Sequence, residues 1–145
     1  MNTLLIFLWI YAAMIAMAFW EAYVEGRHPW DLRKLGWKLK LGKFVLPAYH
    51  FYLFAVMLPL LLTLPLIIYG WDLKLAGILI SAYFSGIVLE DFCWFVVNPA
   101  VKVKEFWSGF TDYYPWIKVK EKKIIPLGYI IFLTIAILSW YFIWR

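Results

Sequence analysis

The chain has 145 residues, of which 66% are hydrophobic and 22% are aromatic, and its formal net charge is +5. A soluble domain of this size exposes too much of its surface to hide so many apolar side chains, so the composition predicts a multi-pass protein of the cell membrane. The cationic residues flank the apolar stretches, which argues against a nucleic-acid partner and indicates contacts with membrane lipids.

Four apolar stretches predict an all-α integral membrane protein in which residues 1–145 form a single four-helix transmembrane domain. Each stretch has about 20 residues, the length that an α-helix needs to cross the hydrocarbon core. The predicted spans cover residues 4–24, 44–69, 75–97 and 124–144. Pro59 and Pro65 interrupt the second span, so we expect a kink or a break in its outer half.

Small residues predict which helix faces pack together, because they allow two helices to approach closely. In the first span the predicted packing seam consists of Ala12, Ala13 and Ala16. In the third span two neighbouring rows at helical spacing should face the other helices: Gly77, Ser81 and Ser85, and beside them Ala82, Gly86 and Glu90.

Between the spans, three short runs alternate apolar residues with lysine, at residues 37–41, 101–104 and 117–120. This alternation is typical of a strand with one charged face. The three runs either pair into a small sheet at the headgroup layer or remain amphipathic loops whose lysines reach the headgroups, and both interpretations stay open. The long third loop is rich in aromatic residues and is expected to rest in the membrane interface.

The distribution of positive charge predicts the orientation of the chain. Of its 14 Lys and Arg residues, only Lys74 and Arg145 lie on the side of the second loop and the C-terminus. The other 12 lie in the first and third loops: Arg27, Arg33, Lys34, Lys38, Lys40, Lys43, Lys102, Lys104, Lys118, Lys120, Lys122 and Lys123. By the positive-inside rule these two loops are cytoplasmic, and both termini lie outside.

Four ionisable residues within the spans are the candidate functional residues. With this topology Glu21, His50, Glu90 and Asp91 all fall in the cytoplasmic third of the membrane, although they come from three different spans. Ionisable groups are costly in lipid, so they are expected to face a protein or aqueous pocket. The sequence therefore predicts a polar pocket near the cytoplasmic leaflet.

Three interpretations of this pocket remain open, and they do not decide whether the protein is an enzyme. In the first, the pocket binds or processes a lipid headgroup, with His50 and Glu90 as acid and base. Four loop lysines would then hold the phosphate: Lys102, Lys104, Lys118 and Lys120.

In the second interpretation the pocket binds zinc or iron through His50 and Glu90, with Glu21 or Asp91 as a further ligand. No pair of metal ligands at i, i+3 or i, i+4 spacing, such as HExxH, is expected in the spans. In the third, the polar groups merely join helices, and the protein is an accessory subunit that docks other membrane subunits or a second copy through its basic loops.

Overall fold

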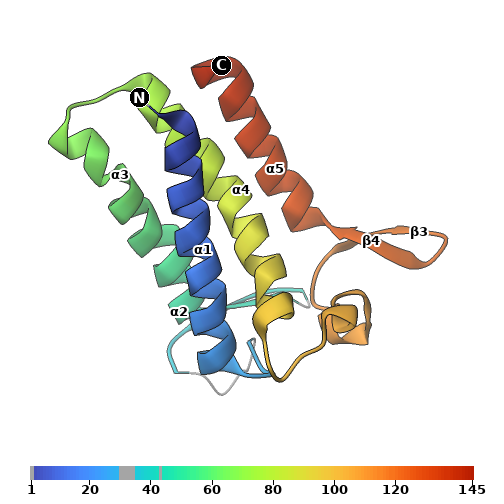
Figure 1. Ribbon diagram of the computed structural model, residues 1–145. Helices are drawn as coiled ribbons and strands as arrows, with labels where there is room; N and C mark the ends of the chain where they lie inside the picture. Colours follow the sequence, from blue (N-terminus) through green and yellow to red (C-terminus); the bar gives the residue numbers. More distant parts are fainter. Residues whose placement is uncertain (1, 30–34, 43) are drawn as a thin grey trace.

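The computed structural model describes residues 2–29, 35–42 and 44–145. In these residues four helical segments are long and apolar enough to cross a membrane, as predicted: Thr3–Glu25, Ala48–Ile68, Leu73–Val97 and Leu127–Trp144. They run alongside one another as a bundle (Figure 1). Three of the cations counted in the first loop, Arg33, Lys34 and Lys43, lie outside the described residues.

The first and third segments are continuous helices, α1 (Thr3–Glu25) and α4 (Leu73–Val97). Each begins at a side-chain cap, because the side-chain oxygen of Asn2 accepts from the N–H of Leu5 and that of Asp72 from the N–H of Leu75. α4 ends at Asn98, which Pro99 forces into an extended conformation.

The second segment consists of α2 (Ala48–His50), a π-helical stretch (Phe51–Met57) and α3 (Leu58–Ile68). The outer half of this segment, α3, is not broken and continues through Pro65, whereas the departure from α-helical geometry is a π-helix in the first half. The π-helical stretch ends at Met57, two residues before Pro59. In a regular α-helix the ring of Pro59 would clash with the carbonyl of the preceding turn. The fourth segment is α5 (Leu127–Ser139), which continues as a π-helical turn (Trp140–Trp144).

α4 lies at the centre of the bundle, between α1 and α5 (Figure 1). Its two predicted rows of small residues do face the other helices. A Cβ on Gly86 would lie 3.0 Å from the Met14 side chain of α1, and one on Gly77 would lie 2.6 Å from Ile143. Ser81 donates to the carbonyl of Ala136 at 2.8 Å.

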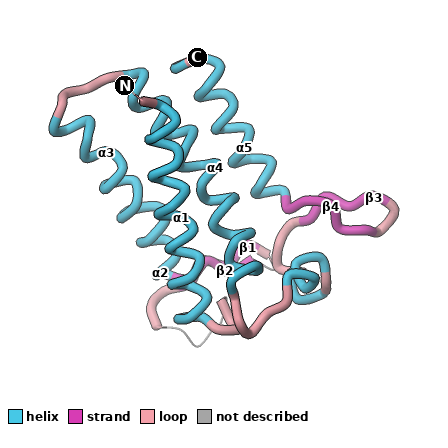
Figure 2. Tube along the Cα trace, in the orientation of Figure 1, coloured by secondary structure: helices cyan, strands magenta, loops and turns pink. Residues whose placement is uncertain are grey.

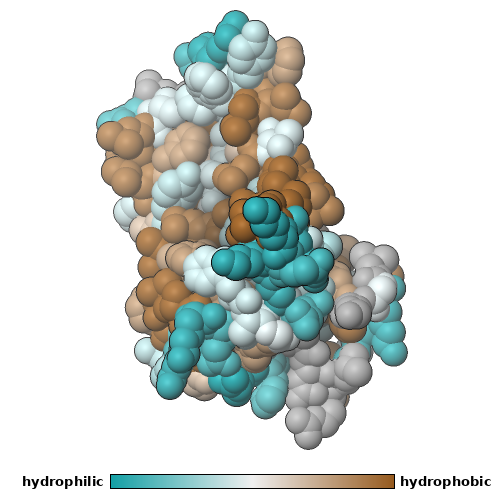
Figure 3. All heavy atoms as spheres, turned by 90° about the vertical axis from the view of Figure 1, so that its right-hand side faces the viewer, coloured by the Kyte–Doolittle hydropathy of each residue, from teal (hydrophilic) through white to brown (hydrophobic). Residues whose placement is uncertain are grey.

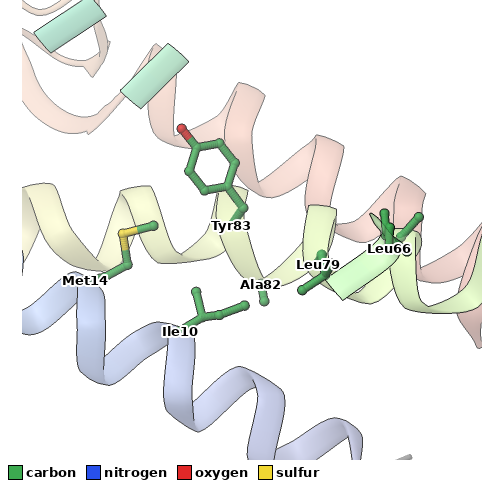
Figure 4. Packing of buried hydrophobic residues seen from close by; sticks show 7 residues of the cluster. Ile10, Met14, Leu66, Leu79, Ala82 and Tyr83 are labelled. Atoms are coloured by element: carbon green, nitrogen blue, oxygen red, sulfur yellow. The ribbon is translucent and has the colours of Figure 1, made fainter. Parts of the chain in front are cut away.

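The predicted seam on α1 is wrong, because Ala12, Ala13 and Ala16 are exposed. Ala18 and Ala22 are buried instead. The buried stripe of α1 continues through Ile10 and Met14, which pack against α4 in the apolar core of the bundle (Figure 4). The packed face of α1 is therefore the one that carries Ile10 and Met14, and the buried alanines of α1 lie on this same face.

Two β-hairpins lie outside the bundle (Figure 2). Strand β1 (Lys38–Leu41) pairs with β2 (Phe44–Pro47), and β3 (Trp116–Val119) pairs with β4 (Lys122–Pro126), both antiparallel. The alternative in which the three alternating runs pair into one sheet is therefore wrong.

The first and third runs form strands in separate hairpins, whereas the second contributes to a 3-10 helix, Val103–Trp107. Glu105 explains this difference, because its carboxylate accepts from the backbone N–H of Lys102 at 3.0 Å and caps the turn.

Each hairpin ends in a proline directly before a membrane-length helix, at Pro47 and Pro126. The second and fourth helical segments therefore begin at Ala48 and Leu127, later than the predicted residues 44 and 124. Proline restricts the preceding residue to extended geometry, and it is tolerated at the start of a helix. The β-branched residues before each proline then favour a strand.

Candidate functional site

The four predicted ionisable residues lie at the end of the bundle where α1 ends and α2 begins. Glu21, His50, Glu90 and Asp91 all line one small cavity there. The remaining walls are formed by the loops and by α4: Pro29, Trp94, Phe95, Tyr113 and Tyr114. The volume open to the centre of a water-sized sphere is about 20 Å³. This is room for about one water molecule or one ion.

A second glutamate of α1, Glu25, joins this site. It follows Glu21 by one helical turn, so both carboxylates lie on the same face of α1. The Nε2 atom of His50 lies 3.4 Å from Oε1 of Glu21 and 3.2 Å from Oε1 of Glu25. All three residues are buried, with exposed fractions of 4%, 8% and 6% for Glu21, Glu25 and His50. One ligand atom from each lies within 4.8 Å of the other two.

Glu25 corrects the expectation that no i, i+4 pair of ligands exists in the spans. Sequence reasoning placed Glu25 in the first loop, but α1 continues through it and ends at Gly26, whose φ is +59°. Glycine adopts a positive φ more easily than other residues and commonly ends a helix, so Gly26 was the signal that could have included Glu25. Asn98 then holds this end against α4, because its side chain donates to the Gly26 carbonyl at 2.7 Å.

Tyr49 supports the cluster from the start of the second helical segment. Its hydroxyl lies within hydrogen-bonding reach of the Glu25 carboxylate and, at 2.9 Å, of the Pro29 carbonyl. Its ring stacks on the His50 imidazole, with centroids 4.2 Å apart. These contacts orient His50 toward the two glutamates of α1.

Glu90 lies across the same cavity and is 3% exposed. Its Oε1 atom is buried and has no hydrogen-bond partner among the described residues, and the same holds for the indole Nε1 of Trp94, one helical turn further along α4. A buried polar atom without a partner costs about 1–3 kcal/mol, and more when it is charged. Both atoms line a cavity with room for a water molecule or an ion, which would supply the missing partner.

Asp91 has a different environment, although it also lines the cavity. One oxygen accepts from the Tyr114 hydroxyl at 2.6 Å, and the other accepts from the Tyr129 hydroxyl. Burial, followed by the neighbouring Asp91 carboxylate, raises the pKa of the Tyr114 hydroxyl well above its usual range, so it remains a donor at physiological pH. Asp91 therefore holds the third loop and α5 against α4, and sequence reasoning missed both tyrosines.

The bond to Tyr129 also fixes the level of the site along the bundle. Tyr129 lies in the first turn of α5, so Asp91 and its neighbour Glu90 are level with the beginning of the fourth membrane-length helix. α4 continues six residues beyond Asp91, to Val97, which corresponds to about 9 Å at 1.5 Å per residue. The cavity is thus placed beside the end of the apolar segments rather than deep among them.

The four lysines predicted to hold a phosphate do not line the cavity. Lys102 and Lys104 lie at a 3-10 helix of the third loop, and Lys118 and Lys120 lie on the hairpin of β3 and β4; all four are exposed. The hairpin of Lys118 and Lys120 extends away from the bundle, whereas the 3-10 helix of Lys102 and Lys104 is tied to the end of α1 through Glu105 and Arg27. The predicted cationic rim above His50 and Glu90 is therefore not formed by these residues.

No protein-family model, curated protein or solved structure matches this chain. The chemistry of the cavity consequently has to be argued from its own side chains.

Proposed function

We propose that this protein is an integral membrane protein that binds a single divalent transition-metal ion in the cavity between α1, α2 and α4. Glu21, Glu25 and His50 are the proposed ligands, and Glu90 faces the same cavity. The observation that carries the proposal is that three potential ligand atoms lie within 4.8 Å of one another, while a fourth, the Oε1 of Glu90, is buried without a partner among the described residues.

The residue types support a transition metal. Imidazole nitrogen together with carboxylate oxygen suits zinc, iron or manganese, whereas calcium and magnesium prefer oxygen alone. Helical bundles also form metal centres from inward-facing carboxylates and histidines on neighbouring helices. A bound cation would compensate the negative charge of the carboxylates that surround His50. In this role His50 is a metal ligand, as in the second interpretation of the sequence, and not an acid.

A lipid phosphate fits the cavity less well than a cation does. The walls carry the carboxylates of Glu21, Glu90 and Asp91, with Glu25 behind them, and none of the described lysines reaches the cavity. Two like charges 4 Å apart repel by about 4 kcal/mol at an effective dielectric constant of about 20. The volume of about 20 Å³ is also far smaller than a phosphate headgroup requires. We therefore favour the metal over the lipid headgroup.

The proposed orientation places both termini outside and the cavity at the cytoplasmic end of the bundle. It rests on the 12 to 2 distribution of Lys and Arg between the two sides. Because the cavity is level with the start of α5, the proposed ion lies near the headgroup layer, where it can exchange with the cytosol. An ion deeper among the helices would need a longer polar path, since charge is costly in lipid.

Elemental analysis of protein purified in detergent from metal-replete cells tests this proposal. We expect about one zinc, iron or manganese ion per chain, and a loss of that ion in Glu25→Gln and in His50→Ala. Glu121→Gln is the matched control, because it removes an acidic charge at an exposed hairpin turn that does not line the cavity. Melting temperatures of all variants separate loss of the metal from loss of the fold.

Absence of a stoichiometric metal in the wild type, together with no rise in melting temperature on titration with zinc or manganese, would contradict the proposal. The polar groups would then merely join helices, and the accessory-subunit interpretation would take precedence.

A further inference from the structure

The hairpin formed by β3 and β4 extends sideways from the bundle, at the point where the chain enters α5 (Figures 1 and 2). Its base is closed by a hydrogen bond from the Leu127 N–H to the Pro115 carbonyl, at 2.7 Å. Because Leu127 is the first residue of a membrane-length helix, the hairpin lies at the level where that helix leaves the apolar layer. This position does not depend on the metal site.

One face of the hairpin is packed against the third loop. The indole N–H of Trp116 donates to the Thr111 carbonyl at 2.8 Å, and the Nζ atom of Lys123 lies 2.8 Å from the Asp112 carboxylate. Lys123 also lies over the Trp116 ring, 5.2 Å from its centroid. These contacts fix the hairpin on the loop and leave its other face uncovered.

The uncovered face is apolar and has a cationic border. Ile117 and Val119, which alternate with the packed face, are 39% and 57% exposed, and Ile124 at the bulge is 51% exposed. Lys122, which pairs with Val119, and Lys120 at the turn are exposed at the border of this face, and Lys118 is exposed on the opposite face. Residues 116–126 contain four lysines but only one acidic residue, Glu121. On the side from which the hairpin extends, hydrophilic side chains gather at its level, beneath the hydrophobic surface of the helices (Figure 3).

The turn keeps charged residues at the far end of the hairpin. Lys120 and Glu121 connect the strands with φ angles of +47° and +62°, a conformation that matches the twist of a two-residue hairpin but that Asn and Gly adopt more easily. Left-handed geometry at a residue other than glycine is strained, so a charged pair at this turn is maintained at a cost in stability.

We propose that this hairpin inserts its Ile117 and Val119 face into the headgroup layer of an anionic bilayer, while its exposed lysines bind the lipid phosphates. Apolar side chains bordered by lysines are the composition that favours binding in the plane of the interface. Each lysine near an anionic surface strengthens such binding roughly fivefold. The charge of the hairpin selects an anionic lipid surface over a neutral one.

The test uses the full-length chain in nanodiscs, with a fluorophore attached to a single cysteine in a Cys93→Ser background. Val119→Cys places the label on the apolar face, and Lys118→Cys, one residue away on the other face, is the matched control. Nanodiscs contain phosphatidylcholine alone or mixed with phosphatidylserine, and a nitroxide on the lipid acyl chain quenches any label that enters the bilayer.

In anionic nanodiscs we expect several-fold stronger quenching at position 119 than at position 118, and a smaller difference in neutral nanodiscs. Lys120→Gln combined with Lys122→Gln should remove most of the dependence on anionic lipid. Equal quenching at both positions, or equal behaviour in both lipids, would overturn the proposal. If the label at position 119 becomes less accessible to a soluble quencher as the protein concentration rises in detergent alone, a second copy of the chain covers this face. That result would also overturn the proposal.

Discussion

Glu90 is a buried carboxylate whose surroundings differ from those of its neighbour Asp91. Its neighbour Asp91 receives a hydrogen bond on each oxygen, whereas the Oε1 of Glu90 has no partner among the described residues. The two adjacent acids therefore have separate roles: Asp91 holds the loop and α5 in place, and Glu90 faces the cavity. This division leads to one prediction for each residue.

The first prediction concerns Glu90→Gln in metal-free protein. Glutamine keeps the shape of the side chain but removes the carboxylate charge, which is costly to bury without a partner, so the variant should be more stable than the wild type by about 1 kcal/mol or more. Thermal melting in the presence of a chelator measures this difference. With zinc or manganese added, the wild type should become more stable than Glu90→Gln, because the bound ion stabilises the wild type more than the variant. A variant that is less stable than the wild type without metal would show that the Glu90 carboxylate has a partner within the protein.

The second prediction concerns the bond between Tyr129 and Asp91. Tyr129→Phe removes one of the two hydroxyls that bind this carboxylate and should destabilise the protein by about 1.5–3 kcal/mol, the range for hydrogen bonds to charged groups. Tyr141→Phe is the control, because Tyr141 is 47% exposed on the last turn of the same helical segment. Chemical denaturation in mild detergent measures both variants. Equal stability of the two would contradict the anchoring role of Asp91.

At the scale of elements, the third loop is held to α1 by an ion pair outside the bundle. Arg27 follows the end of α1, and its guanidinium binds the Glu105 carboxylate, with one contact at 3.2 Å, and the Ala100 carbonyl at 2.9 Å. The hydrogen bond from Arg27 lowers the pKa of Glu105, and the backbone N–H of Lys102 lowers it further.

The third prediction is a pH dependence of stability. Because the folded protein depresses the pKa of Glu105, the ion pair stabilises the fold above the ordinary glutamate value of 4.5, and this stabilisation is lost as the pH falls below it. The melting temperature of the wild type should therefore fall more steeply than that of Glu105→Gln as the pH is lowered from about 5 to about 3. Parallel curves for the two proteins would indicate that the exposed pair contributes nothing measurable.

Sequence patterns predicted the helices better than they predicted the loops. Hydropathy and length predicted the four helical segments, and the small residues of α4 predicted its packed faces. Both features depend on the local composition of the sequence. The strands before Ala48 and Leu127 were missed because their apolar residues continue into the helices, and the two prolines were the remaining signal. The tyrosines that bind Asp91 lie 23 and 38 residues further along the chain, and no spacing rule connects residues so far apart.

At the scale of the whole molecule, α4 organises the bundle through close contacts at its glycines. The Cβ position of Gly77 lies 2.6 Å from the Ile143 side chain, and Ser139 donates to the Gly77 carbonyl at 2.8 Å, so the two helices meet without room for a further methyl group. The same helix carries Glu90 toward the cavity at its other end. The position of the proposed metal site therefore depends on the packing of the helices along their full length.

The fourth prediction compares two glycines in helices. Gly77→Ala should destabilise the protein by about 1–3 kcal/mol, because the added methyl group forces α4 and the end of the chain apart. Gly128→Ala is the control: nothing lies within 4 Å of its Cβ position, so alanine should stabilise α5 by up to about 1 kcal/mol. Denaturation in detergent measures both. Similar effects of the two substitutions would contradict the close packing of α4 at Gly77.

X-ray absorption spectroscopy of the metal-loaded protein tests the central claim most directly. In a His28→Ala variant, His50 is the remaining histidine of the chain, so any imidazole bound to the metal comes from the cavity. With zinc we predict a first shell of nitrogen and oxygen at about 2.0–2.2 Å, with the outer-shell scattering of one imidazole. A shell of water oxygens without imidazole, or a sulfur ligand at about 2.3 Å from Cys93, would contradict the proposed site.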